Sequence, residues 1–102
     1  MIDLTVEELK EKIENDPNAI ILDVRTDDEV EEGMIENAKH IDIFGGQQFI
    51  DGIKELDTSK NIYVYCRSGK RSVQACTIMA QEGFDNLYNL LGGYMEWEEE
   101  NA

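Results

Sequence analysis

A short apolar run that ends at a cysteine constrains the fold of this chain more than any other feature. Residues 61–65 have the length and composition of a buried strand, and residues 73–82 have the spacing of a helix. The turn between them reads Cys66-Arg67-Ser68-Gly69-Lys70-Arg71-Ser72. It holds three of the nine Lys and Arg residues of a chain whose formal net charge is −14. We interpret this local positive charge as a site for anions, namely the Cys66 thiolate and an anionic substrate.

Strand and helix patterns alternate along the whole chain. Strands are expected at residues 2–4, 19–24, 38–43, 62–65 and 87–90, and helices at 5–14, 27–32, 49–56, 73–82 and from Gly93 onward. Such alternation favours a mainly parallel sheet of about five strands with helices on both faces. We therefore predict one α/β domain over residues 1–102. The helix at 73–82 is apolar around much of its circumference, so we expect it deep in the fold.

The composition excludes several classes of partner. The 23 Asp and Glu residues, against 9 Lys and Arg, disfavour nucleic acid and anionic membrane surfaces. No apolar stretch approaches the roughly 20 residues of a membrane span, and the first residues lack the layout of a signal peptide. The two cysteines, ten positions apart and without a CxxC pair, do not suggest a disulfide framework. We therefore expect a cytoplasmic protein.

The turn at 66–72 has the features that activate a thiol. A helix N-terminus and nearby cations lower the pKa of a cysteine from about 8.5, which yields the nucleophilic thiolate. Gly69 permits a backbone conformation in which consecutive N–H groups form an anion-binding nest. Since ligands of parallel sheets bind at the carboxyl ends of strands, we predict that Cys66 is the catalytic nucleophile. The residues expected to bind the substrate are Arg67, Ser68, Gly69, Lys70, Arg71 and Ser72.

Two phosphate-binding motifs match the turn only in part. A Walker loop needs glycine five positions before Gly69 and a serine or threonine after Lys70, but this chain has Val64 and Arg71 there. Cysteine-dependent phosphatases place arginine six residues after the cysteine, where this chain has Ser72. Arg71 comes one residue earlier. The shorter loop forms a smaller cradle, which suits one large atom better than a phosphoryl group.

The turn resembles the active-site loop of rhodanese domains, the thiosulfate sulfurtransferases. The resemblance extends over nearly the whole chain. Further segments similar to family markers are Leu22-Asp23-Val24-Arg25, Gly33-Met34-Ile35 with Ala38 and Ile41, and Leu91-Gly92-Gly93 with Trp97. Met34 departs from the family, whose members usually have histidine there. Because that histidine is not the nucleophile, the change leaves Cys66 unaffected but can alter packing or the rim of the pocket.

The resemblance implies a two-step transfer of sulfur. Cys66 attacks the outer sulfur of thiosulfate, sulfite leaves, and the Cys66 persulfide passes its sulfur to cyanide, another thiol or a protein acceptor. The partners implied are thus a small anionic sulfur donor and a thiophilic acceptor, with no metal and no organic cofactor. Two other functions stay open. One is a non-catalytic rhodanese-like module that binds or regulates a protein, and the other, disfavoured by the loop length, is a phosphatase or arsenate reductase.

A few side chains outside the turn are weaker candidates for the site. Asp23 and Arg25 follow the second strand and can face the same rim; we expect a structural ion pair, with Glu29 as the partner of Arg25. Cys76 lies on the apolar helix, where a buried small hydrophobe is more common than a resolving thiol. His40, the only histidine, is expected to be structural, because nothing in the sequence brings it to the turn.

Overall fold

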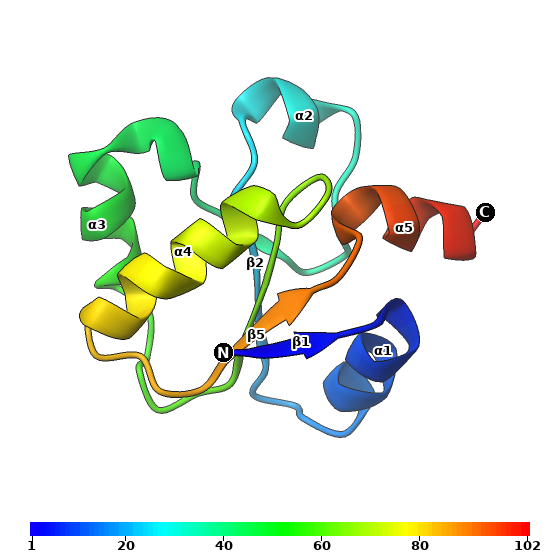
Figure 1. Ribbon diagram of the computed structural model, residues 1–102, viewed down its shortest axis with the longest axis horizontal. Helices are drawn as coiled ribbons and strands as arrows, with labels where there is room; N and C mark the ends of the chain where they lie inside the picture. The colour runs from blue at the N-terminus through cyan, green and yellow to red at the C-terminus, as the bar shows by residue number, and fades with distance from the viewer.

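The structure, a computed structural model, describes residues 1–102 and contains five strands, five α-helices and one 3-10 turn (Figure 1). In chain order the elements are β1 (Ile2–Leu4), α1 (Val6–Glu14), β2 (Ile20–Asp23), α2 (Asp27–Glu31), β3 (Lys39–His40), η1 (Ile43–Gly45), α3 (Gln47–Ile53), β4 (Ile62–Tyr65), α4 (Lys70–Gln81), β5 (Leu87–Leu90) and α5 (Gly93–Glu100). Most of the predicted elements are found within a few residues of their expected bounds.

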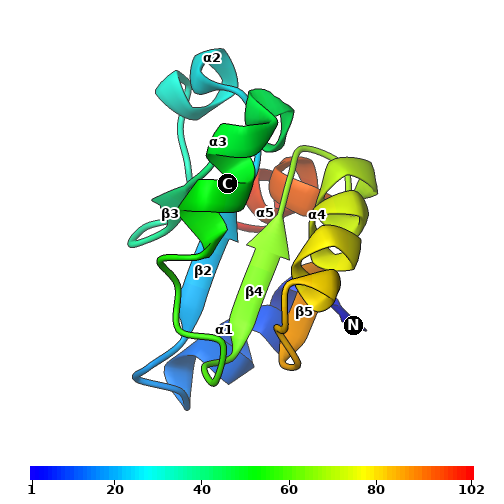
Figure 2. The same ribbon diagram turned by 90° about the vertical axis from the view of Figure 1, so that its left-hand side faces the viewer.

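All five strands are parallel and form one sheet in the order β1-β5-β4-β2-β3. Helices α3 and α4 cover one face, and α1 and α5 cover the other (Figure 2). The predicted α/β fold, with a parallel five-stranded sheet between helices, is therefore confirmed. Because β4 is the central strand, the turn that follows it lies in the middle of the sheet's carboxyl edge.

The central strand is fixed by packing on both of its faces. Ile62 and Val64 belong to the core under α3 and α4, whereas Tyr63 and Tyr65 belong to the core under α1 and α5. Every residue of β2 and β4 is buried, which explains why both segments read as continuous apolar runs. Cys66 directly follows this rigid strand, so its sulfur has a defined position.

The strand predicted at 38–43 is wrong beyond its first residues. Only Lys39–His40 pairs with β2, and the chain then enters η1. The Asp42 carboxylate accepts a hydrogen bond of 2.8 Å from the Phe44 N–H and caps this turn, which takes the chain away from the sheet. Ile41 and Ile43 still pack against the core, so their apolar alternation does not require a strand.

Helix α4 begins three residues earlier than predicted, at Lys70, and it does not lie deep in the fold. The sheet covers only one side of it, where Ala75 and Met79 are fully buried. Val73 on the other side is 38% exposed, so the expectation that this helix lies deep in the fold is wrong. With 12 residues α4 is the longest helix, and none of the helices has the length and apolar character of a membrane span.

Candidate active site

The Cys66 sulfur lies at the junction of β4 and α4, at the N-terminal end of the helix. The Gly69 N–H donates a hydrogen bond to Sγ at 3.0 Å, and the N–H groups of Ser68 and Ser72 also contribute. Gly69 has φ +117°, a conformation that glycine adopts without strain and that turns these N–H groups toward the sulfur. The turn thus has the form of the anion-binding nest that the sequence predicts.

Two opposing influences act on the ionisation of Cys66. Burial raises the pKa of the thiol, since the residue is only 1% exposed. Hydrogen bonds from the Ser72 hydroxyl, when it donates, and from the backbone N–H groups of the turn stabilise the thiolate and lower the pKa by more. The net result is a pKa below the ordinary value of a cysteine. The geometry therefore favours a thiolate that is shielded from bulk water.

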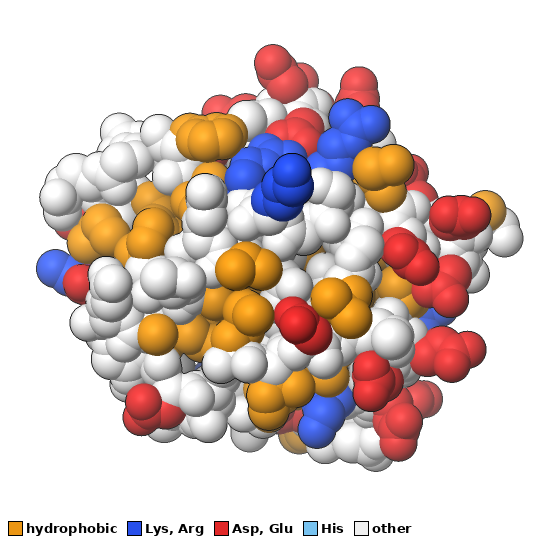
Figure 3. Space-filling model, viewed as in Figure 1, with side chains coloured by type: hydrophobic (Ala, Val, Ile, Leu, Met, Phe, Trp, Pro, Cys, Tyr) orange, Lys and Arg blue, Asp and Glu red, His pale blue; other side chains and the backbone are white.

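The cations of the turn differ in how they are bound. Arg67 and Lys70 are exposed and form no salt bridge. Figure 3 shows a group of Lys and Arg side chains near the N-terminal end of α4, whereas acidic side chains dominate the surface over α1 and α5. The only free positive charge beside Cys66 thus comes from Arg67 and Lys70 on the turn and the first turn of α4.

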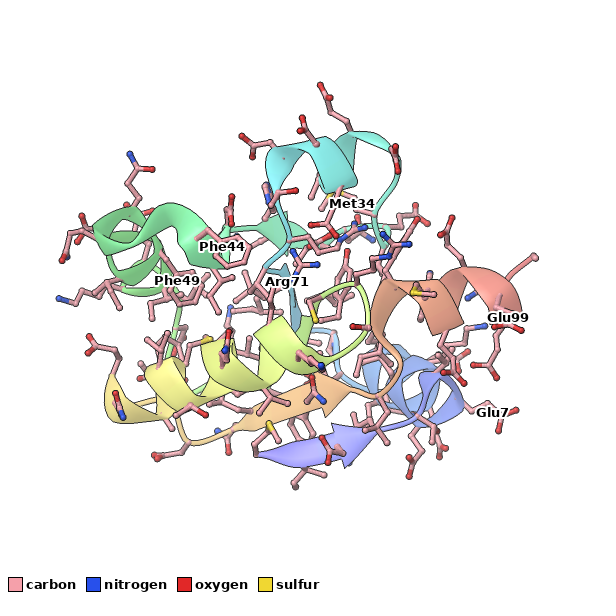
Figure 4. All side chains as sticks on the ribbon, turned by 45° about the horizontal axis from the view of Figure 1, so that its top comes forward. Glu7, Met34, Phe44, Phe49, Arg71 and Glu99 are labelled. Atoms are coloured by element: carbon pink, nitrogen blue, oxygen red, sulfur yellow. The ribbon has the colours of Figure 1, made fainter.

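Arg71 is engaged by α2. Its guanidinium donates two hydrogen bonds to the Glu29 carboxylate, at 2.6 and 2.8 Å, and lies 5.9 Å from the centre of the Phe44 ring (Figure 4). The bond to Arg71 lowers the pKa of Glu29 to about 2, despite the opposing effect of partial burial. The sequence did not reveal this pair, although Thr26 and Glu29 form a capping box that marks Glu29 as a fixed carboxylate.

Asp23 and Arg25 form a buried ion pair at the carboxyl end of β2. Arg25 donates to both carboxylate oxygens of Asp23, with a shortest distance of 2.7 Å, and to the carbonyl of Gly33 at 2.7 Å. Its guanidinium also lies 4.3 Å from the centre of the Tyr94 ring. The predicted pairing of Arg25 with Glu29 is wrong. Arg25 forms its salt bridge with Asp23, and Glu29 forms its salt bridge with Arg71.

The N-terminus of α5 holds the backbone of the turn. Tyr94 N–H donates to the Cys66 carbonyl at 2.8 Å, and Met95 N–H donates to the Arg67 carbonyl at 3.1 Å. At Gly93 a Cβ would lie 2.5 Å from the backbone of Arg67, so only glycine allows this approach. The pair Gly92-Gly93 is a visible signal in the sequence, but local pattern assigns it only the role of a turn before a helix.

Ser72 and Asn89 lie on the interior side of the sulfur. Ser72 is completely buried, with its Oγ 3.4 Å from Cys66 Sγ and 2.5 Å from Asn89 Oδ1. Ser72 therefore contacts the nucleophile from within the protein, whereas it was expected among the residues that face the substrate. Asn89 was not singled out, although a polar residue inside the apolar segment Leu87–Leu90 is the kind of signal that marks a buried network.

The remaining candidates lie apart from the sulfur. Cys76 is buried in the core under α4, and burial raises the pKa of its thiol to about 12. His40 Nε2 lies 2.6 Å from the Arg25 carbonyl oxygen and has no hydrogen bond to the turn. Met34 is half-buried in the segment after α2 (Figure 4).

A polar hollow of about 250 Å³ adjoins the turn. Its lining residues are Arg25, Glu29, Glu32, Arg67, Tyr94, Met95 and Glu98. Cys66 is not among them, but Arg67 follows it in the chain and the Tyr94 N–H donates to its carbonyl oxygen. The mixture of two cations and three carboxylates makes this hollow suitable for a polar group and unsuitable for an apolar ligand.

Comparison with known proteins identifies one domain family. The sequence model of the rhodanese-like domain matches residues 5–100. The putative sulfurtransferase YtwF of Bacillus subtilis is 42% identical over 92 residues, which cover 90% of this chain and 85% of that protein. The thiosulfate sulfurtransferase GlpE of Coxiella burnetii is 33% identical over 79 residues, covering 78% and 71%. The crystal structure of a rhodanese-like domain protein from Staphylococcus aureus superimposes with a TM-score of 0.83 at 32% identity, covering 95% of this chain and 91% of that one.

Proposed function

This chain belongs to the rhodanese-like domain family, and we propose that it is a sulfurtransferase that carries sulfane sulfur on Cys66. The observation on which this rests is the hydrogen bond of 3.0 Å from the Gly69 N–H to Cys66 Sγ, at the N-terminus of α4. Such a setting favours a nucleophilic thiolate and needs no attached base. The names of the relatives, the putative sulfurtransferase YtwF and the thiosulfate sulfurtransferase GlpE, support the same reaction class.

In the first step the Cys66 thiolate attacks the outer sulfur of a donor such as thiosulfate. A new S–S bond forms on Cys66, the S–S bond of thiosulfate breaks, and its electron pair leaves with sulfite. The charge of the departing dianion is stabilised by Arg67 and Lys70, the two cations of the site that have no acidic partner. Arg71 contributes its charge from a fixed position on Glu29 and has few donors left for the substrate.

In the second step a thiophilic acceptor attacks the terminal sulfur of the persulfide. Its S–S bond breaks, the electron pair returns to Cys66, and the N–H groups of the turn again stabilise the thiolate. Cyanide, a small thiol or a protein thiol can serve as acceptor. Because Cys66 is 1% exposed, small donors and acceptors are the best matched. Both cysteines are free thiols, which suits the reducing cytoplasm that we propose as the location.

The test is to incubate the protein with thiosulfate, remove the excess and measure the intact mass. One added sulfur that cyanide removes, that is absent in Cys66→Ala and that persists in Cys76→Ala, supports the proposal. A chain that gains no sulfur from thiosulfate or from any other sulfane donor would instead be a binding module. Release of phosphate from an aryl phosphate, abolished by Cys66→Ala, would replace the proposal with a phosphatase.

A further inference from the structure

A polar side chain occupies a core position behind the nucleophile. Asn89 is the third residue of β5, and its side chain faces α4, as does that of Leu87. It is only 2% exposed. A buried amide without hydrogen bonds is costly, so an asparagine at such a position indicates fixed partners.

Asn89 has a partner on each side. Its Nδ2 donates to the Asp3 carboxylate at 3.0 Å, across the β1–β5 pairing in which Asp3 and Asn89 are direct neighbours. Its Oδ1 lies 2.5 Å from Ser72 Oγ. Ser72 in turn lies 3.4 Å from Cys66 Sγ. A continuous chain of hydrogen-bonding groups thus leads from the edge strand to the sulfur.

The chemistry of these groups fixes the direction of the bonds. A carboxylate only accepts hydrogen bonds, so Asn89 must turn its NH₂ toward Asp3. Asn89 then presents its carbonyl oxygen to Ser72, and the hydroxyl hydrogen must lie between the two oxygens. A hydroxyl has one hydrogen. When Ser72 donates to Asn89, it offers only lone pairs to the Cys66 sulfur.

We propose that Asn89, oriented by Asp3, is a positioning residue that competes with the Cys66 sulfur for the hydrogen of the Ser72 hydroxyl. In the thiol form of Cys66, Ser72 donates to Asn89 and accepts the S–H hydrogen. In the thiolate form, the sulfur gains the Ser72 hydrogen only at the expense of the short bond to Asn89. The chain from Asp3 therefore limits how strongly the protein ionises its nucleophile.

This inference refines the proposed function, because thiolate is the form of Cys66 that would accept sulfur. A less stabilised thiolate is the stronger nucleophile, so a balance between ionisation and reactivity is useful to a sulfur carrier. The Gly69 carbonyl lies 3.1 Å from Ser72 Oγ and is a weaker competitor for the same hydrogen. Asn89 has the shorter bond and is the group that Asp3 can orient.

The other charged groups around the turn must stay constant in a test, and Arg71 among them interacts with Cys66 through its charge. These groups are Arg67 and Lys70 on the turn and α4, Arg71 with Glu29 on α2, and Arg25 with Asp23 at the end of β2. None of them forms a hydrogen bond with Asn89. Substitutions at Asn89 therefore change the hydrogen-bond chain and leave the charges of the site as they are.

The experiment measures the ionisation of Cys66 without any sulfur donor. The thiolate absorbance in the far ultraviolet and the rate of alkylation by iodoacetamide are recorded against pH, and the alkylated cysteine is identified by peptide mass. In Asn89→Leu, which has a similar volume and no acceptor, the Ser72 hydrogen is free for the sulfur. We expect the midpoint of the Cys66 titration, the pH at which half of the thiol is ionised, to fall by about half a pH unit or more. This is the scale of one ordinary hydrogen bond. Ser72→Ala should raise the midpoint, because it removes the donor.

The double variant Ser72→Ala/Asn89→Leu distinguishes competition for the Ser72 hydrogen from a purely structural role of Asn89. In a Ser72→Ala background, Asn89→Leu should have no effect on the midpoint, since there is no hydrogen to compete for. Asp3→Ala changes an exposed residue and leaves Asn89 free to rotate. It should therefore lower the pH at which half of Cys66 is ionised. The part of this shift that comes from the rotation of Asn89 should be absent in a Ser72→Ala background.

Two results overturn the proposal: an unchanged or raised midpoint in Asn89→Leu, or an equal shift in both backgrounds. If Asn89→Leu does not fold, the same comparison is made with Asp3→Ala in the wild-type and Ser72→Ala backgrounds, and an equal shift in both again overturns the proposal. Failure of sulfur transfer leaves these readouts intact, so the two proposals fail separately.

Discussion

Glu29 of α2 and Arg71 of α4 form a double hydrogen bond, at 2.6 and 2.8 Å, across the carboxyl edge of the sheet. The two residues are 42 positions apart in the chain, yet each lies in the helix that follows a buried parallel strand. The pair fixes α2 over the first turn of α4 and neutralises one of the three cations in the segment that follows Cys66. This edge of the sheet is therefore less positive than the sequence of the turn suggests.

This pair makes stability depend on pH in a defined direction. The pKa of Glu29 is lowered to about 2, so the stabilisation is complete above its ordinary value of 4.5 and is lost as the pH falls toward 2. We expect Glu29→Gln, which keeps the capping box, to reduce the free energy of unfolding at pH 7 by about 1 kcal/mol, since the pair is partly exposed. Urea denaturation should show that this difference in the free energy of unfolding from wild type becomes smaller near pH 3.

The control is Glu31→Gln, which lies on the same helix and has no salt bridge. An equal loss of stability in Glu31→Gln would refute a specific role of Glu29.

The unpaired cations should govern the binding of an anionic donor. We expect Lys70→Ala and Arg67→Ala each to raise the KM for thiosulfate about three- to tenfold, because each removes one charge near a divalent anion. The free energy of unfolding should change by less than about 0.5 kcal/mol, as both side chains are exposed. Lys54→Ala, at the distant end of α3, removes the same charge and should leave KM unchanged. Steady-state kinetics at constant ionic strength make the comparison, and equal KM values for all three variants would contradict it.

The two cysteines should react very differently with alkylating reagents. The pKa of Cys66 is lowered, whereas burial raises the pKa of Cys76 to about 12. At pH 7 we therefore expect one alkylation per folded chain, at Cys66, with a rate that falls as the pH drops through the lowered pKa. Mass spectrometry should show no product in Cys66→Ala and an unchanged product in Cys76→Ala. Slow modification of Cys66, at the rate of an ordinary thiol, would argue against an activated nucleophile.

The sequence predicted the elements that local patterns control. The apolar runs at 19–24 and 62–65, the helix predicted at 5–14 and the turn after residue 65 each contain their own signal, and all are found in the structure. The start of α4 was missed because its cap, Gly69, makes no side-chain hydrogen bond and so leaves no recognisable start signal. The third strand was overextended because Ile41 and Ile43 pack against the core although neither lies in a strand, Ile43 being the first residue of η1.

The parts of the site that escaped prediction join residues far apart in the chain. Glu29 meets Arg71, and Asp3 meets Asn89 across 86 positions. Periodicity carries no information on such pairs, because they depend on strand order and register. Once the order β1-β5-β4 is known, the pairing of Asp3 with Asn89 follows from the register, and a polar pair beside the central strand becomes a recognisable feature.

The approach of α5 to the turn gives the last prediction. At Gly93 (φ +57°) an added Cβ would lie 2.5 Å from the Arg67 carbonyl group and 2.6 Å from the Cys66 carbonyl oxygen. Gly93→Ala should therefore push α5 away, weaken the bonds from Tyr94 N–H and Met95 N–H, and cost about 2–4 kcal/mol of stability. Sulfur transfer should fall in the protein that remains folded, because the backbone behind Cys66 is no longer fixed.

Gly83→Ala is the matched control. Its φ is also positive (+96°), but an added Cβ would have no atom within 4 Å, so only about 1 kcal/mol of backbone strain is expected. Urea denaturation and persulfide formation, measured on both variants, would contradict this account if Gly83→Ala lost as much stability and activity as Gly93→Ala.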